Sequence, residues 1–148
     1  MNEPQDLGRF LEAQHGVYEQ VRSELRGGRK RSHWMWFIFP QLQGLGSSST
    51  ARFYAIGSLA EARAFLAHPV LGARLRECTQ LVNELREKTL EEILGYPDHL
   101  KFRSCMTLFE RAAGSGQGDA VFRAALDQYC GGEGDPLTVR LLTSASGT

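Results

Sequence analysis

The sequence predicts an all-α protein, an irregular multihelical single domain with buried central helices. Apolar residues recur at helical steps of three and four along almost the whole chain, and no segment alternates apolar and polar residues as a half-buried strand would. Gly and Pro residues, together with Ser, Thr and Asp caps, divide this pattern into short segments. We therefore expect about six to eight short helices around one core.

Length and composition restrict the class of protein. A chain of 148 residues fits one domain, with a core over about residues 6–142 and a frayed tail at 143–148. Apolar residues make up 42% and charged residues 23% of the chain, which excludes an intrinsically disordered protein. Basic and acidic residues number 17 each, so no overall positive field favours nucleic acid or an anionic membrane.

Two further features predict a cytoplasmic protein without a membrane partner. The longest apolar run covers residues 34–39, far short of the about 20 residues that a membrane helix needs. The N-terminus is polar and acidic, unlike a secretory signal. Cys78, Cys105 and Cys130 lie far apart and predict small core residues rather than a disulfide framework.

The first half of the chain predicts two helices and a loop. Residues 7–25 carry apolar side chains at helical spacing, with Asp6 as a candidate N-cap and Gly27 at the stop. The aromatic run at 33–39 predicts a short buried helix because helices flank it, although its pattern also fits a buried strand. Residues 44–49 are rich in Gly and Ser and predict a loop.

The middle of the chain has clear helix starts. Residues 58–61 and 89–92 read as capping boxes, and Gly95 closes the second helix quickly. Between them, Pro69 suits the first turn of a helix whose apolar stripe runs over residues 71–85.

Three more helices are predicted toward the C-terminus. Asp98 is the candidate cap of the first, and residues 114–118 predict a flexible break after it. Asp119 caps the second, which Gly131 ends, and Asp135 begins a last short helix.

A basic and aromatic cluster follows the first helix and suggests an anion site. Between residues 22 and 31, five basic side chains accompany a single acid. Such a local excess favours a phosphate, with Arg29 and Lys30 as candidate ligands of a diphosphate. Trp34 would then line a base or ribose pocket, with Trp36 as the alternative ring. A solvated basic turn beside core aromatics is the other interpretation.

His33 stands between the basic turn and the apolar run. Its imidazole could donate to a phosphate or act as a general acid, or it could equally bond a backbone carbonyl. No histidine has a second histidine or a cysteine three or four residues away, so we expect neither a metal nor a cofactor. The usual nucleotide-binding and hydrolase motifs are also absent from the sequence.

A second polar cluster begins at Asp98. On a helix that starts there, Lys101 lies one turn along and Ser104 a further turn. A carboxylate, an amine and a hydroxyl on one surface could stabilise a sugar oxocarbenium ion, attack an opened sugar aldehyde or hold a diphosphate. The alternative is a capping Asp98 with an i, i+3 ion pair to Lys101. The loop amide of Gln41 is a further candidate for substrate binding.

Several segments resemble the bacterial domain-of-unknown-function 1810 family. They are residues 6–14, 30–41, 44–46, 54–56, 68–75 and 98–109, with the specific string HWMWFIFPQ at 33–41. The resemblance covers nearly the whole chain and implies a small all-helical fold, but no established activity. Members are sometimes labelled calpastatin, a name that nothing in these residues supports.

A more distant similarity concerns the NAD- and ADP-ribose-associated superfamily. A helical Lys101-Phe102, a spacer, a Phe…Leu helix and a late Gly…Asp follow each other in the order found there. Some members remove ADP-ribose from a nucleobase, with a lysine able to bond the sugar covalently, and that lysine would correspond to Lys30 or Lys101. The two polar clusters, together with this resemblance, lead us to expect a hydrolase of the N-glycosidic bond in an ADP-ribose-type nucleotide. In it, Asp98 and Lys101 would act at the anomeric carbon, and His33 would assist proton transfer.

Two other functions stay open, namely a non-catalytic module that binds a nucleotide or nucleic acid, and an interaction protein whose aromatic run forms a dimer face. The expected partner of the hydrolase is a small nucleotide or an ADP-ribosylated base. The enzymatic prediction requires that the basic turn and the segment after Asp98 meet around a common hollow.

Overall fold

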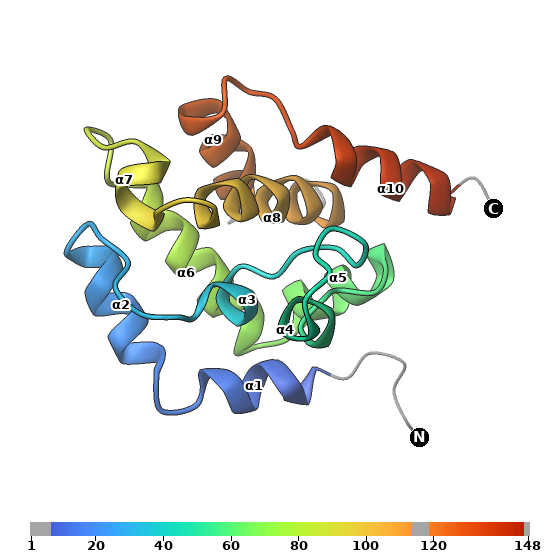
Figure 1. Ribbon diagram of the computed structural model, residues 1–148, viewed down its shortest axis with the longest axis horizontal. Helices are drawn as coiled ribbons and strands as arrows, with labels where there is room; N and C mark the ends of the chain where they lie inside the picture. The colour runs from blue at the N-terminus through green and yellow to red at the C-terminus, as the bar shows by residue number, and fades with distance from the viewer. Residues whose placement is uncertain (1–6, 114–118, 147–148) are drawn as a thin grey trace.

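Every regular element in the described part of the chain is a helix, as predicted. The structure is a computed structural model that describes residues 7–113 and 119–146. Within these ranges it contains α1 (Gly8–Gln14), α2 (Tyr18–Arg26), α3 (Met35–Ile38), α4 (Ser49–Phe53), α5 (Leu59–Ala67), α6 (Leu71–Asn83), α7 (Leu90–Leu94), α8 (Asp98–Ala112), α9 (Ala120–Tyr129) and α10 (Pro136–Ser146) (Figure 1). In the same ranges the one β feature is an isolated bridge between Leu42 and Ile56.

The count of ten described helices exceeds the prediction for two reasons. Residues 7–25 form two helices because Gly16 has φ +82°, which a right-handed helix cannot contain. The apolar spacing continues across Gly16, so the sequence pattern does not indicate the break there. The short α4 was not predicted, and it begins where the Oγ of Ser48 accepts the N–H of Ala51 at 3.0 Å.

The predictions for the chain ends have different outcomes. The candidate cap Asp6 and the predicted break at 114–118 lie outside the described residues. The tail was expected to fray from 143, but α10 continues to Ser146. The aromatic run forms the short buried helix α3, as predicted.

The predicted helix starts are confirmed where a Ser, Thr or Asp oxygen accepts from the helix. Thr89 and Glu92 form the complete capping box of α7. The Oγ of Ser58 accepts from Glu61, but the Glu61 carboxylate accepts from the N–H of Gly57 rather than from that of Ser58. At α10, the carboxylate of Asp135 accepts the N–H three residues on, at 3.0 Å.

Asp98 and Asp119 do not cap their helices, contrary to the prediction. Asp98 is the first residue of α8, and the N-cap position belongs to Pro97. Asp119 occupies the N-cap position of α9 but makes no capping hydrogen bond, and its carboxylate pairs with Arg76 at 2.7 Å. Both carboxylates therefore bind cations from other segments.

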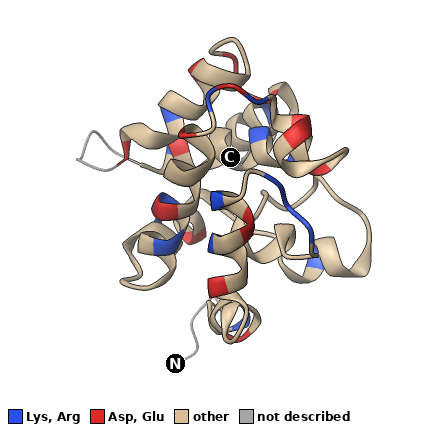
Figure 2. Cartoon of the chain, turned by 90° about the vertical axis from the view of Figure 1, so that its left-hand side faces the viewer, with Lys and Arg blue, Asp and Glu red and all other residues tan. Residues whose placement is uncertain are grey.

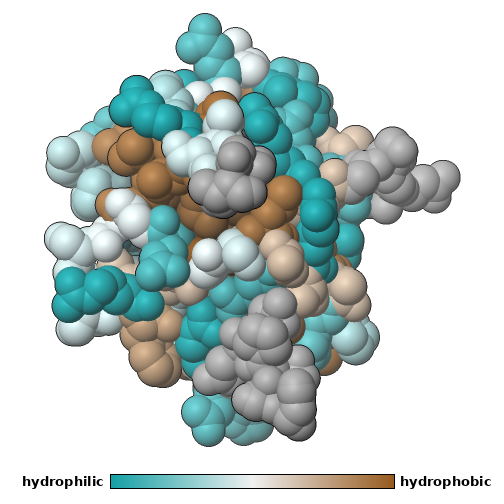
Figure 3. Space-filling view, turned by 90° about the vertical axis from the view of Figure 1, so that its right-hand side faces the viewer, coloured by the Kyte–Doolittle hydropathy of each residue, from teal (hydrophilic) through white to brown (hydrophobic). Residues whose placement is uncertain are grey.

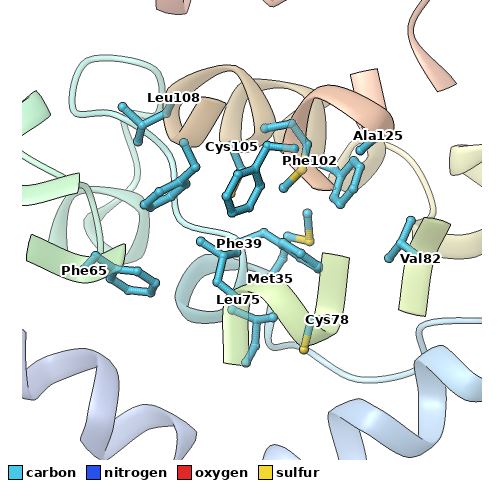
Figure 4. Packing of buried hydrophobic residues seen from close by; sticks show 14 of the residues in the cluster. Met35, Phe39, Phe65, Leu75, Cys78, Val82, Phe102, Cys105, Leu108 and Ala125 are labelled. Atoms are coloured by element: carbon cyan, nitrogen blue, oxygen red, sulfur yellow. The ribbon is translucent and has the colours of Figure 1, made fainter. Parts of the chain in front are cut away.

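The core lies around α8, which runs through the centre of the fold and packs against α5, α7, α9 and α10 (Figure 1). Figure 4 shows Phe39, Phe65 and Phe102 in the same core, each from a different segment. The rings of Phe39 and Phe102 stack edge to face with centroids 5.0 Å apart, and those of Phe65 and Phe109 lie 5.4 Å apart. Each such ring contributes about 1.5–3 kcal/mol by burial, so these contacts fix α8 firmly.

The cysteines are free thiols, as expected. Cys78 and Cys105 belong to the core, whereas Cys130 is half-buried at the end of α9. Burial raises the pKa of all three thiols. They act as small apolar groups rather than as thiolates at neutral pH.

One glycine sets the distance between α5 and α6. A Cβ on Gly72 would overlap the backbone carbonyl oxygen of Leu66, so the two helices could not approach as closely with any other residue there. The turn between them is held by His68, whose Nδ1 accepts the N–H groups of Val70 and Leu71 at 3.1 and 3.2 Å.

Apolar side chains also gather on the surface that carries α10 (Figure 3). A groove of about 400 Å³ lies there, lined by Leu42, Leu59, Leu141 and Leu142 among others. None of the predicted site residues borders this groove. In the described part of the chain, no helix is long and apolar enough to cross a membrane.

Candidate functional site

The basic turn, residues 27–33, leaves the end of α2 and is held by the buried carboxylate of Glu24. Figure 2 shows the turn's three consecutive cations as an unbroken blue stretch of chain. The carboxylate accepts hydrogen bonds from Arg31 N at 2.8 Å, Ser32 N at 3.1 Å, Ser32 Oγ at 2.6 Å, Trp34 Nε1 at 2.8 Å and Gln20 Nε2 at 2.9 Å. The turn therefore has a fixed backbone.

These hydrogen bonds also decide the charge of Glu24. Burial acts to raise its pKa, but the hydrogen bonds from Ser32, Arg31 and Trp34 outweigh that effect. They lower the pKa from 4.5 to about 2. Glu24 is an ionised anchor throughout the physiological range.

Trp34 belongs to the core and presents no ring face to a ligand, contrary to the prediction. Its side chain is 2% exposed, its ring lies 6.2 Å from that of Phe39, and its indole N–H is used by Glu24. Trp36, two residues on, is half-buried and borders a cleft. The alternative ring is thus the one that a ligand can reach.

Lys30 connects the basic turn to the start of α8. Its backbone N–H donates to the carbonyl of Ile93 at 2.7 Å, and its Nζ lies 2.9 Å from Oδ2 of Asp98. The side chain is only 9% exposed and its Nζ lies 5.4 Å from the ring centroid of Trp34. The two predicted polar segments therefore meet, through this ion pair.

Asp98 binds a second lysine on its other oxygen. The Nζ of Lys101 lies 3.4 Å from Oδ1, which is the i, i+3 pair that the sequence offered as an alternative. The same Nζ lies 4.9 Å from the ring centroid of Trp36. One carboxylate thus joins two ammonium groups, and each of these lies over a different tryptophan.

A cleft of about 490 Å³ opens beside Lys101, a size typical of small-molecule sites. It is lined by Trp36, Gln41, Leu45, Gly46, Ser47, Ser48, Ala51, Pro97, Leu100, Lys101, Arg103, Ser104, Asp135 and Leu137. Three predicted site residues border it, namely Gln41, Lys101 and Ser104. Lys30 and Asp98 do not line the cleft. They connect to it through the ion pair between Asp98 and Lys101.

Two predicted site residues lie apart from the cleft. Arg29 and His33 are exposed on the basic turn and do not border this cleft. They do not border the hollow on the other side of Arg103 either. Of the two polar segments, only the second therefore lines the cleft, and the basic turn contributes Lys30 as a supporting side chain.

Arg103 is a site residue that the sequence did not single out. Its Nε donates to the carbonyl of Glu133 at 3.1 Å and its Nη2 to that of Gly134 at 2.9 Å, which ties α8 to the loop before α10. Arg103 follows Lys101 by two residues in the sequence, but the loop that holds its side chain is distant in sequence. Only the folded chain brings these carbonyls to the guanidinium.

The rim of the cleft opposite α8 is a tight loop. A Cβ on Gly46 would lie 2.6 Å from the Cβ of Ala51, so the loop can pack on α4 only with glycine there. The carbonyl of Ser47 accepts from Arg52 at 2.7 Å, which closes the loop.

A second hollow of about 540 Å³ lies on the other side of Leu100 and Arg103, which border both. His99, Cys130 and the carboxylates of Glu91 and Glu133 line it. In the described parts of the chain, no group of three His, Cys, Asp or Glu side chains is arranged to hold a metal ion.

Fold and cleft together define a small all-helical protein with one cationic, tryptophan-bordered cleft at the start of its central helix. The chain belongs to the family described as protein of unknown function (DUF1810), whose profile matches residues 4–142. This confirms the membership that the sequence motifs indicated.

A solved structure is similar to this chain over almost its full length. It is that of the conserved hypothetical protein Rv1873 from Mycobacterium tuberculosis, with 55% identity, a TM-score of 0.91, and coverage of 95% of this chain and 99% of that chain. Among curated proteins, none matches. The resemblance to the NAD- and ADP-ribose-associated superfamily stays a prediction, since neither match bears on it.

Proposed function

We propose that the cleft binds an ADP-ribose-type nucleotide derivative and that the protein hydrolyses its N-glycosidic bond. The observation that carries the proposal is the pairing of a cation with an aromatic ring at the cleft, since Lys101 Nζ lies 4.9 Å from the ring centroid of Trp36. A nucleotide offers the matching pair, a flat base for stacking and phosphates for the ammonium.

Arg103 supplies a second cation for the phosphates. Two of its nitrogens are held by carbonyls, which leaves Nη1 without a hydrogen-bond partner among the described residues. A guanidinium fixed in this way loses little side-chain freedom when it binds phosphate. The chain as a whole carries no net charge, so the attraction for an anion is local to this cleft.

Uncharged groups at the cleft suit a sugar. Gln41 is half-buried and borders the cleft, and Ser104 presents its hydroxyl at the floor with a hydrogen bond to the carbonyl of Leu100 at 3.3 Å. An amide and a hydroxyl can together donate to and accept from ribose hydroxyls.

The reaction requires a water molecule and a negative charge near the anomeric carbon. The bond between that carbon and the base nitrogen breaks, the electron pair and a proton go to the base, and the water oxygen bonds the carbon. Asp135 borders the cleft and can stabilise the oxocarbenium ion, since only its Oδ2 is engaged, by Thr138. In this assignment Asp98 acts through Lys101 rather than at the sugar.

Binding and turnover of the full chain test the proposal separately. Calorimetry with ADP-ribose measures binding, and chromatography of an ADP-ribosylated nucleoside measures release of the base. We expect Lys101→Met to weaken binding about 10- to 100-fold, the loss of a hydrogen bond to a charged group. Trp36→Leu should weaken it about 10-fold through lost stacking.

The matched control is Arg63→Met, which removes an exposed cation of α5 that does not border the cleft. It should leave both measurements unchanged. No heat with ADP-ribose, together with no released base, would overturn the proposal.

A second function, nucleotide binding without hydrolysis, is favoured by one observation. Asp98, the carboxylate predicted to act at the sugar, is neutralised by two lysines and does not line the cleft. Binding of ADP-ribose with no base released from any N-glycoside would select this function. Such binding should weaken steeply as salt rises.

A further inference from the structure

We infer that Lys30 is a positioning residue for the cleft, because it keeps Asp98 neutralised when Lys101 leaves that carboxylate for an anionic ligand. This inference rests on the proposed function and concerns the same site, where it describes how Lys101 moves from Asp98 to the ligand. Lys30 itself does not touch the ligand, since it does not line the cleft.

The two ion pairs of Asp98 differ in the way that such an exchange requires. Lys30 Nζ lies 2.9 Å from the carboxylate and its side chain is 9% exposed, whereas Lys101 Nζ lies 3.4 Å away and is 26% exposed. The closer, better buried pair is the permanent one. The longer, more exposed pair is the one that a phosphate can replace at lower cost.

The backbone around Lys30 keeps its ammonium in place. Its own N–H is fixed to the carbonyl of Ile93 at 2.7 Å, and the next two residues are fixed to Glu24. The backbone of Lys101 is held by the first turn of α8, where its N–H donates to the carbonyl of Pro97 at 3.4 Å, but its ammonium is the more exposed of the two and lies at the longer distance from Asp98. Its ammonium can therefore move from the carboxylate to a ligand while that of Lys30 stays.

Electrostatics make the exchange depend on both lysines. Asp98 is 18% exposed, so a carboxylate stripped of every cation would be poorly solvated there. With Lys30 present, the carboxylate keeps a partner after Lys101 leaves. Without Lys30, the carboxylate holds its remaining cation more tightly and competes with the ligand for it.

A double-mutant cycle measured by calorimetry tests this dependence, with ADP-ribose and, separately, inorganic pyrophosphate as probes. Lys30→Met should weaken binding about 10-fold in the native background and less than about 2-fold in the Asp98→Asn background. Lys30→Arg, which keeps the charge, should bind within about 2-fold of the native protein. Urea unfolding of each variant confirms that the compared proteins are folded.

The outcomes separate this inference from the proposed function. An equal loss from Lys30→Met in both backgrounds overturns the inference, because it is the result expected from general attraction of an anion by a distant charge. Pyrophosphate binding with the predicted coupling, but no binding of ADP-ribose, supports the inference and removes the proposed function. Failure to bind either probe overturns both.

Discussion

The basic turn is held by two carboxylates whose hydrogen-bond partners differ in kind. Glu24 accepts from backbone N–H groups, a hydroxyl, an indole and an amide, all within ten residues along the chain. Asp98 instead binds two ammonium groups, one of them from a segment far away in sequence. The first carboxylate lies among neutral donors fixed by the fold, and the second among cations on long side chains.

This difference separates an anchor from an exchangeable site. The backbone, hydroxyl and indole donors to Glu24 are positioned by the local fold, so they hold its carboxylate permanently. Ammonium groups on flexible stems can serve a carboxylate or a ligand phosphate. The stability of the fold should therefore depend on Glu24, and the properties of the cleft on Asp98.

The largest effect is expected from Glu24→Gln. The amide removes the charge and turns an NH₂ group toward donors that need an acceptor, so the protein should lose about 3 kcal/mol of unfolding free energy. Urea unfolding followed by circular dichroism measures the loss. Glu91→Gln, at an exposed carboxylate on α7, is the control and should cost less than about 0.5 kcal/mol.

An intermediate effect is expected from acid. The pKa of Glu24 is lowered to about 2 from 4.5, so its contribution is complete above pH 4.5 and is lost as the pH falls toward 2. The urea midpoint of the native protein should fall over this window more than that of Glu24→Gln. Parallel curves for the two proteins would show that the ionised carboxylate is not what holds the turn.

The smallest effect on stability is expected from Asp98→Asn. The amide oxygen still accepts from Lys30, whose ammonium keeps its place over the Trp34 ring, so the loss should be about 1 kcal/mol. Urea unfolding of Asp98→Asn and Glu24→Gln under the same conditions compares the two losses of unfolding free energy. A loss as large as that of Glu24→Gln would erase the distinction between anchor and exchangeable site.

Much of the fold could be predicted because helical spacing and caps are local properties. The stripe of α6, the capping box of α7 and the buried faces of α8 and α9 follow from residues close together in the chain. The break at Gly16 could not be predicted, because a positive φ at one glycine leaves the apolar spacing around it unchanged.

The site could be predicted in part. Gln41, Lys101 and Ser104, which border the cleft, could be predicted as site residues. Polar groups that share one face of α8, or that follow Pro40, indicate a surface that a ligand can reach. The choice between Trp34 and Trp36 could not be made, because the four residues of α3 are all apolar and so show no polar side in the sequence. The sequence predicted a phosphate as the partner of Lys30, because its partner in the fold, Asp98, lies in a distant segment.

The contact at Gly72 has a use in comparing sequences. Any chain aligned with this one that carries a side chain at that position must hold its fifth and sixth helices farther apart or tilt one of them. That single column therefore separates homologues that keep this helix pair intact from those in which the pair has been rebuilt.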